Sequence, residues 1–393
     1  MKNNFRITLL LVVSFVITGC KGKSKEDPRM THEYIYYRDG REEQVSNPSI
    51  NAKIKDGVSL SILPNEWMGF YDEDNYSKMR LYYEYGVENT KPVPITLTWD
   101  DDLDCKTYGV NISTNKDMSN AVKFSSGSDK SLTLKDLFAG THYYYQVTAD
   151  FEDKTIVSRR FDFFTADFIR TLDIDGVQNA RDIGNKKTDD GKKRVKQGMV
   201  YRSANFDYVT TLGKQDALEK YGIKTDLDLR EPGPTSSPLG DAVKYFNNAT
   251  QLKGSPQYVS EDNGVNSVAY QTTMLNNLKV FADKDNYPIA FHCAIGRDRT
   301  GTLAITLFLL LGINLDQIQQ DYIVSFFSSA CNKDSFENCG EQLETLLYYF
   351  QAYKGKDGVN SGTIYERAQE YATDIGLSVD EINKIRDNLL ENY

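Results

Sequence analysis

The sequence predicts a multidomain chain in which an all-β sandwich precedes an α/β domain. Its 393 residues exceed what one hydrophobic core usually holds. Between about residues 47 and 165, short segments alternate apolar with polar side chains, as half-buried strands do. After Phe168, short apolar segments alternate with longer helical ones, a pattern typical of a parallel sheet with crossover helices. We therefore place a domain boundary near residue 167.

Residues 1–19 are predicted to be a signal peptide. Two basic residues precede an apolar run, residues 7–17, that is too short to span a bilayer as a helix. The run leads into Thr-Gly-Cys, and this ending resembles a bacterial lipoprotein signal, which implies cleavage before Cys20 and lipidation of its sulfur. We expect an exported, membrane-anchored lipoprotein on the periplasmic or outer surface of a bacterial envelope, with residues 20–46 as a polar tether. A plain secretory signal with an incidental cysteine is the alternative.

Residues 47–167 are predicted to form the sandwich. Its segments are rich in β-branched and aromatic residues, and polar turns separate them at short intervals. The clearest strands are residues 95–99, 107–114, 142–151 and 159–167. The layout, with Trp99 on an early strand, resembles a fibronectin type III or related immunoglobulin-like module, and this resemblance assigns no chemistry. Tyr143 and Tyr145 are expected in the core, with a sugar-binding face as the alternative.

Residues 168–393 are predicted to form an α/β domain with a central, mostly parallel sheet flanked by helices. The predicted strands are residues 225–230 and 287–293, and the predicted helices include residues 268–282, 300–313 and 377–390. Residues 300–313 are apolar on every side, which predicts a fully buried helix. The last helix carries a capping box from Ser378 to Glu381.

The loop between the second strand and the buried helix reads "FHCAIGRDRTG". The net charge of −10 excludes a basic field that would attract nucleic acid, so a site for an anion needs its own positive field. Inward backbone N–H groups and the helix N-terminus provide one, and Gly296 gives the backbone freedom to turn. Arg299 adds a planar, two-pronged donor. The predicted phosphate-binding residues are Ala294, Ile295, Gly296, Arg297, Asp298 and Arg299.

The same field predicts a reactive sulfur at Cys293. A helix N-terminus and nearby cations lower a thiol pKa from about 8.5 into a range of roughly 3.5–7.5. The thiolate then attacks a bound phosphate ester, an alkoxide or phenoxide leaves, and water hydrolyses the cysteinyl-phosphate. His292 is expected to orient the loop, and Thr300 to donate its hydroxyl to the departing sulfur. No cofactor is expected.

The loop resembles the signature of cysteine-dependent protein tyrosine phosphatases, which is His-Cys, five residues, Arg, then Ser or Thr. Upstream, "NARDIG" (179–184), "VKQGMVYRSANF" (195–206) and "DLREP" (228–232) stand in the order seen in the bacterial tyrosine/serine phosphatase branch, alongside the atypical dual-specificity enzymes. The resemblance covers roughly residues 168–393. It implies a tyrosine-phosphatase-like domain that hydrolyses a phosphorylated protein or a small phosphomonoester. Cys-x5-Arg alone also occurs in rhodaneses and arsenate reductases.

The resemblance implies two candidates for the general acid that protonates the leaving oxygen. Asp298, inside the loop, is favoured slightly, and Asp228 is the other. Asp228 also fits a purely structural pairing with Arg230 or Arg202. Arg297 stands where lipid-directed relatives often carry lysine, so it either engages a second phosphate or is a solvated loop charge.

Three other functions stay open on sequence grounds: a phosphoinositide or inositol phosphate phosphatase, a non-catalytic surface binding protein, and a sulfur transferase. Cys331 and Cys339 bracket a polar loop and are a possible disulfide in an exported protein. No cluster of cysteines and histidines has metal-ligand spacing, so no metal site is predicted.

Overall fold

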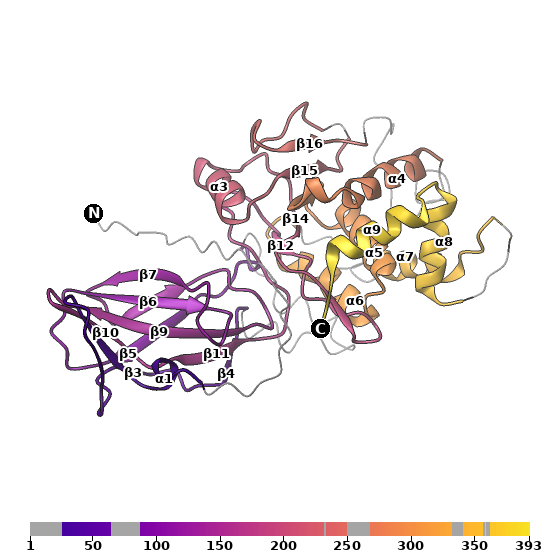
Figure 1. Ribbon diagram of the computed structural model, residues 1–393. Coiled ribbons are helices and arrows are strands. Elements are labelled where there is room, and N and C mark those ends of the chain that lie inside the picture. Colours follow the sequence, from indigo (N-terminus) through magenta and orange to yellow (C-terminus); the bar gives the residue numbers. More distant parts are fainter. Residues whose placement is uncertain are drawn as a thin grey trace. The chain divides into compact units, whose positions relative to one another are not determined.

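The computed structural model describes residues 26–63, 87–231, 233–249, 268–331, 341–356, 358 and 362–393 (Figure 1). The chain divides into two compact units, Met1–Ile62 with Val93–Phe168, and Leu63–Pro92 with Ile169–Tyr393. The second unit is therefore discontinuous in sequence. The prediction of one unbroken sandwich over residues 47–167 was wrong in this respect, because residues 87–92, in its middle, belong to the second unit and form hydrogen bonds within it.

The described part of the first unit is built almost entirely of strands, in an eight-stranded sheet and a three-stranded sheet. Its elements are α1 (Pro28–Thr31), β1 (Tyr34–Tyr37), β2 (Glu42–Gln44), β3 (Asn51–Ala52), β4 (Val58–Leu60), β5 (Ile95–Asp100), β6 (Thr107–Ser113), β7 (Val122–Gly127), β8 (Ser131–Leu134), β9 (His142–Asp150), β10 (Lys154–Val157) and β11 (Phe161–Thr165). Trp99, Tyr143 and Tyr145 are buried. The two tyrosines are therefore core residues and do not form a sugar-binding face.

Part of the predicted tether, residues 20–46, is folded. β1 and β2 form an antiparallel hairpin, and β1 pairs with β10 in the large sheet. Gly40, at φ +89°, makes the turn, and the carboxylate of Glu33 is buried where it accepts hydrogen bonds from Ser49 and Ile50. The tether prediction was wrong here because the polar composition of the segment concealed a hairpin whose tyrosines are only half-buried.

The second unit is an α/β domain with a mixed sheet. The strand order is β12-β14-β17-β15-β16, in which β12 (Arg181–Asp182) runs antiparallel to β14 (Val200–Ser203). The other neighbours, β17 (Ile289–His292), β15 (Thr225–Asp228) and β16 (Lys244–Phe246), are parallel. The prediction of a mostly parallel sheet is confirmed for this part of the chain. A further ribbon joins β13 (Lys193–Val195) to β18 (Leu390–Asn392).

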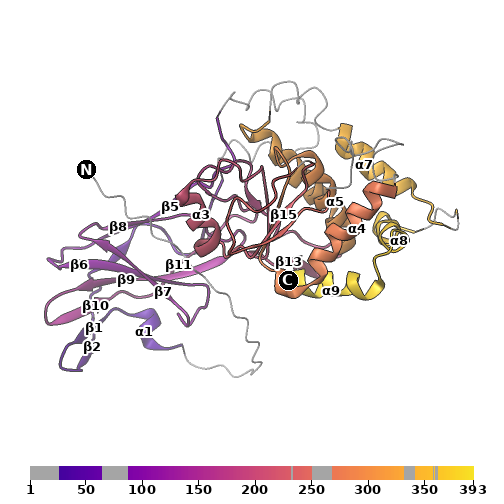
Figure 2. The ribbon, with the colours of Figure 1, turned by 90° about the horizontal axis from the view of Figure 1, so that it is seen from above.

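Helices cover both faces of this sheet. Figures 1 and 2 show α4, α5, α8 and α9 gathered on one side of it and α3 on the other. The helical elements are α3 (Thr211–Gln215), η3 (Asp216–Lys220), α4 (Val268–Ala282), η4 (Lys284–Asn286), α5 (Asp298–Leu311), α6 (Leu315–Val324), η5 (Ser325–Phe327), α7 (Glu341–Ala352), α8 (Ile364–Asp374) and α9 (Val379–Leu389). None of the described helices is both long and apolar enough to cross a membrane.

Two helix predictions are met closely. Every residue of α5 from Thr300 to Leu311 is buried, as an apolar surface on all sides requires. α5 begins at Asp298, so the last residues of the signature loop form its first turn. The capping box of α9 is present, with Ser378 and Glu381 each accepting from the other's backbone.

Parallel pairing sets the edge at which the signature loop lies. In register, His292 is opposite Ser203 on β14 and opposite Asp228 on β15. The carboxyl ends of these three strands therefore meet at one edge of the sheet, where ligands bind in open α/β folds. Cys293 is the next residue of the chain.

Candidate active site

Cys293 lies between β17 and α5 and is 2% exposed. The residues after it form a tight loop, and α5 directs its N-terminus at that loop. Since the first N–H groups of a helix have no partner within the helix, this end carries partial positive charge. The sequence order alone, strand, loop, buried helix, brings these groups together.

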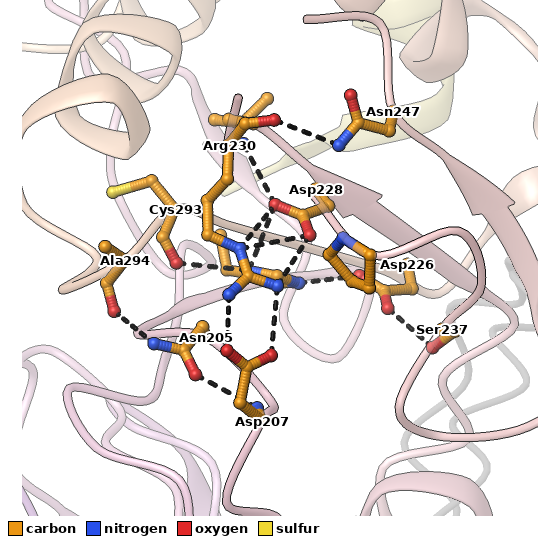
Figure 3. A network of polar contacts seen from close by, with 12 residues as sticks. Asn205, Asp207, Asp226, Asp228, Arg230, Ser237, Asn247, Cys293 and Ala294 are labelled. Atoms are coloured by element: carbon orange, nitrogen blue, oxygen red, sulfur yellow. Dashed lines mark hydrogen bonds and ion pairs between the residues drawn. The ribbon is translucent and has the colours of Figure 1, made fainter. Parts of the chain in front are cut away.

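The carbonyl oxygens of the loop are each held by the surrounding scaffold. Asn205 donates from N and Nδ2 to the Ala294 oxygen at 3.2 and 2.7 Å (Figure 3). Asn179 Nδ2 donates to the Ile295 oxygen at 2.9 Å, and Arg202 Nη2 to the Gly296 oxygen at 2.9 Å. His292 Nδ1 lies 3.2 Å from the Cys293 oxygen.

Outward carbonyls dictate the direction of the amides. In a trans peptide the C=O and the following N–H point in opposite directions. Holding the oxygens of residues 293–296 outward therefore turns the N–H groups of residues 294–297 to the inside of the loop. Such an inward array is an anion-binding nest.

Gly296 permits the closest approach in the loop. Its φ is +74°, and a Cβ there would lie 2.4 Å from the backbone oxygen of Ser203. A side chain at this position would strain the backbone and collide with the end of β14. The predicted need for glycine is met by both its conformation and its packing.

The pKa of the Cys293 thiol is lowered from its ordinary value. Burial raises this pKa, but the side chain and N–H of Thr300, the charge of Arg299 and the N–H of Gly296 together lower it by more. The buried Thr300 hydroxyl has no other hydrogen-bond partner among the described residues, so it keeps its donor for the sulfur. The sulfur is thereby favoured as a thiolate.

Arg299 lies in the first turn of α5. Its Nη1 is 3.5 Å from the Leu229 oxygen, and its buried Nε has no partner among the described residues. The guanidinium therefore keeps donors for an anion held in the nest.

His292 is fully buried in a network with two carboxylates. Its Nε2 lies 2.9 Å from Asp226 Oδ1, and the other oxygen of Asp226 accepts from Ser237 Oγ at 2.5 Å (Figure 3). Burial lowers the pKa of His292, and Asp226 and Asp228 raise it by more. With both ring nitrogens facing acceptors, the imidazolium form is favoured and the ring fixes the start of the loop.

The two candidate acids have different surroundings. Asp228 is buried and accepts from Arg230, whose Nη2 lies 2.8 Å from Oδ2, and Arg230 also pairs with Asp207 (Figure 3). Burial raises the pKa of Asp228, but hydrogen bonds and charge from Arg230 and the charge of His292 lower it by more. The pairing with Arg230 is the structural alternative that the sequence left open; the described contacts of Asp228 do not include Arg202.

Asp298 stands at the first position of α5 and is paired with Arg297. Arg297 Nε donates to Asp298 Oδ1 at 2.6 Å, and the guanidinium lies 5.3 Å from the centre of the Phe326 ring. The side chain of Arg297 is 12% exposed. The alternative of a solvated loop charge is therefore wrong, because the aromatic ring and Asp298 enclose the guanidinium.

A second layer behind the loop was not found from the sequence. Asp321 of α6 pairs with Arg181 Nε at 3.3 Å, with Lys186 Nζ at 3.2 Å and with Arg202 Nη1. Burial raises the pKa of Asp321, and these three cations lower it by more. Asn179 and Arg202 stand inside segments that carried the family resemblance, whereas nothing in the sequence distinguishes Asp321 from other acids.

Two of the predicted cysteine sites lie outside the described residues. These are Cys20, expected to be lipidated, and Cys339. Cys331 is buried with its sulfur 2.9 Å from the Ser325 oxygen, and its disulfide with Cys339 stays a prediction. Within the described ranges, no group of three or more histidine, cysteine or acidic residues is placed to hold a metal ion.

The chain resembles proteins named as phosphatases. A protein of Cupriavidus necator, named as a candidate tyrosine-protein phosphatase, is 27% identical over 175 residues, which is 39% of this chain and 62% of that protein. OCA1 of Debaryomyces hansenii, named likewise, is 32% identical over 126 residues, 32% of this chain and 61% of its own. The chain thus spans about three fifths of the length of these two relatives.

Two solved structures were also matched. The Siw14 catalytic core is 16% identical, with a TM-score of 0.24 over 37% of this chain and 88% of that one. The core catalytic domain of the PP-IP phosphatase SIW14 from S. cerevisiae in complex with citrate is 17% identical, with a TM-score of 0.26 over 39% and 90%.

The family is shown by a broader match. The model of the tyrosine phosphatase family fits residues 172–391, which is more than half of the chain and includes β17, the signature loop and α5. The chain therefore belongs to the tyrosine phosphatase family.

Proposed function

We propose that this protein is a phosphomonoester hydrolase of the tyrosine or dual-specificity type. The observation that carries the proposal is the buried Cys293, whose thiol pKa is lowered inside a ring of inward N–H groups. An anion held by those groups and by Arg299 would sit against the sulfur. The family membership and the names of the relatives support the same activity.

The reaction follows from these groups. The Cys293 thiolate attacks phosphorus, the P–O bond to the leaving group breaks, and a cysteinyl-phosphate forms. Inward amides and Arg299 stabilise the charge that develops on the three non-bridging oxygens. Water then attacks the same phosphorus and gives a proton to the carboxylate left by the general acid, the S–P bond breaks, and Thr300 stabilises the departing thiolate with its hydroxyl.

Asp298 is the general acid in this proposal. Asp228 is a poor donor because it is fully buried and because Arg230 and His292 hold its pKa low, so it stays ionised. Asp298→Asn is expected to lower kcat by about 100-fold or more for phenyl phosphate, and by less for p-nitrophenyl phosphate, whose leaving group needs less help. Equal losses for both esters, or a larger loss in Asp228→Asn, would remove Asp298 from this role.

The activity is tested with p-nitrophenyl phosphate under reducing conditions. We expect turnover by the wild type and none by Cys293→Ser, which should still bind orthovanadate or phosphate. Equal turnover by both proteins would exclude the proposed nucleophile. Binding without turnover would favour a non-catalytic binding protein, and activity on thiosulfate would identify sulfur transfer.

The substrate class is assigned by assaying phosphotyrosine peptides, phosphoserine peptides, phosphoinositides and soluble inositol phosphates side by side. We expect phosphopeptides to be preferred. Arg297 is enclosed by Asp298 and Phe326, so a second phosphate would first have to displace these contacts. A higher kcat/KM for a polyphosphorylated inositol would reverse this preference.

We further propose that the protein is an exported lipoprotein anchored through Cys20, with the β unit as a fibronectin type III-like spacer or binding module. The support is the sequence of residues 1–20 and the all-β character of the first unit. Metabolic labelling with a fatty acid and membrane fractionation test the anchor. Cys20→Ala should abolish the label and release the protein from membranes, and an unlabelled, unattached wild type would exclude lipidation.

A further inference from the structure

We propose that Glu88 is a positioning residue for the phosphate-binding loop. Glu88 belongs to residues 87–92, here called the strap, which lie in sequence between β4 and β5 but belong to the second unit. The expected effect on kcat rests on the proposed function. The expected effects on the Cys293 thiol and on anion binding can be measured without turnover.

Both carboxylate oxygens of Glu88 accept hydrogen bonds. Oε2 accepts from Ser328 Oγ at 2.8 Å, from Ser329 N at 3.0 Å and from Ser329 Oγ at 2.8 Å. Oε1 accepts from Asn179 N at 3.4 Å, and from the N–H and hydroxyl of Thr90. One side chain thus joins the strap to the two segments that contain Asn179 and Ser328.

The first connection leads directly to the nest. Asn179 is buried and has a φ of +54°, a left-handed conformation that L-residues seldom adopt. Its Nδ2 holds the Ile295 oxygen outward at 2.9 Å. By accepting the Asn179 N–H, Glu88 stabilises the backbone conformation from which that side chain reaches the loop.

The second connection leads to the candidate acid. Ser328 and Ser329 directly follow η5, which carries Phe326, the ring against which Arg297 packs. The strap contacts the same turn again, because Asn89 N donates to the Phe327 oxygen at 3.1 Å. Fixing this turn fixes the surface that holds the Arg297 side chain beside Asp298.

The site requires an anionic acceptor. Every described partner of Glu88 donates to it, including three backbone N–H groups that cannot turn away, those of Thr90, Asn179 and Ser329. A glutamine has an NH₂ group in place of one carboxylate oxygen. That group would face the donors that the lost oxygen had accepted from, and those donors would have no acceptor. Glu88→Gln therefore changes the side-chain volume very little but removes the hydrogen bonds accepted by one of the two carboxylate oxygens.

The chain offers two matched controls. Glu33 of the first unit is a buried carboxylate that accepts from Ser49 N, Ser49 Oγ and Ile50 N at 2.7–3.0 Å, so Glu33→Gln is the same chemical change without a connection to the loop. Lys91 of the strap pairs with Asp173 at 3.0 Å and is half exposed, so Lys91→Met perturbs the strap without touching Glu88.

The experiment uses the full chain with each substitution. The Cys293 thiol pKa is read from the pH dependence of its alkylation by iodoacetamide, followed on the Cys293 peptide by mass spectrometry. Orthovanadate affinity reports the nest, and kcat and KM on p-nitrophenyl phosphate report the reaction. Thermal unfolding identifies the temperature range in which all proteins are folded.

For Glu88→Gln we expect a higher thiol pKa, about tenfold weaker vanadate binding and a kcat about tenfold lower, with KM changed less. Glu33→Gln and Lys91→Met should match the wild type in all three. If Glu88→Gln does not fold, Ser329→Ala, which removes one donor to Oε2, should shift the same readouts in the same direction. An unchanged thiol pKa and vanadate affinity in a folded Glu88 or Ser329 variant would overturn the inference. If the wild type hydrolyses no phosphate ester, the proposed function fails, and alkylation and vanadate binding still decide the role of Glu88.

Discussion

Replacing Gly296 with alanine tests the geometry of the nest most directly. The added Cβ would lie 2.4 Å from the Ser203 oxygen, 2.5 Å from the Ser203 carbonyl carbon and 2.7 Å from the Ala204 nitrogen. All three atoms are backbone at the end of β14, so no side chain can rotate to make room. The loop itself must move.

The size of the effect follows from these distances. Restoring an ordinary contact of 3.4 Å to the Ser203 oxygen requires the loop to move by about 1 Å. A misplacement of about 1 Å between reacting groups lowers rates by about 100-fold. The left-handed φ of +74° adds a conformational cost of about 1–2 kcal/mol for alanine.

The assay is kcat on p-nitrophenyl phosphate together with thermal unfolding. Gly312→Ala is the matched control, because Gly312 ends α5 at φ +71° with no atom within 4 Å of its added Cβ. It should lose about 1–2 kcal/mol of stability and keep its activity. If Gly296→Ala retained kcat within about twofold of Gly312→Ala, the close approach of loop and strand would not be what aligns the reacting groups.

Three other substitutions probe the surroundings of the loop. Asp321→Asn leaves the buried Arg181, Lys186 and Arg202 without the anion that they share. In denaturant titrations it should lower the free energy of unfolding by about 3 kcal/mol or more. A change below about 1 kcal/mol would contradict the pairing. Arg299→Lys keeps the charge but removes the planar fork, so phosphate inhibition should weaken at least about tenfold, and equal inhibition would show that charge alone suffices. Asp226 and Asp228 raise the pKa of His292 above the ordinary 6.5, so the stability that His292 contributes is fully present below about pH 6.5 and is lost as pH rises through the raised pKa. In urea titrations between about pH 6 and pH 9, the free energy of unfolding of His292→Asn should therefore fall less with pH than that of the wild type. Parallel pH profiles for the two proteins would exclude this contribution of His292.

The signature loop could be predicted because its determinants are consecutive in sequence. β17, Gly296, Arg299 and α5 fall within residues 289–311, and each carries a local signal such as strand pattern, turn freedom or uniform apolarity. Short-range signals of this kind depend on neighbouring residues alone. The position of Cys293 between a strand and a buried helix followed from the same pattern, and the structure then showed that this is the carboxyl edge of the parallel strands.

The scaffold that holds the loop depends on residues far apart in sequence. Asn179 reaches an oxygen 116 residues away, and Arg202 reaches an acid 119 residues away. Residue type predicts that a buried arginine needs an acid, but only the fold selects Asp321 as that acid. The partner of Asp228 is local, since Arg230 follows it by two residues, but the sequence alone could not choose between this neighbour and the more distant Arg202.

Two segments were misjudged because composition conceals long-range pairing. β1 and β2 look like a polar tether until β10 is known to lie beside them. The strap has no motif of its own, and its significance comes from the donors that surround Glu88. Propensity is a weak guide wherever tertiary contacts determine the conformation.

The discontinuity of the second unit constrains how this protein can be divided or recombined. A fragment starting at Phe168 would contain the whole signature loop yet omit Leu63–Pro92, and an exchange of the β unit by crossover at residue 168 would discard the same residues. A transplanted catalytic region would therefore need the strap, residues 87–92, supplied from the donor, because Glu88 contacts the segments that hold the loop.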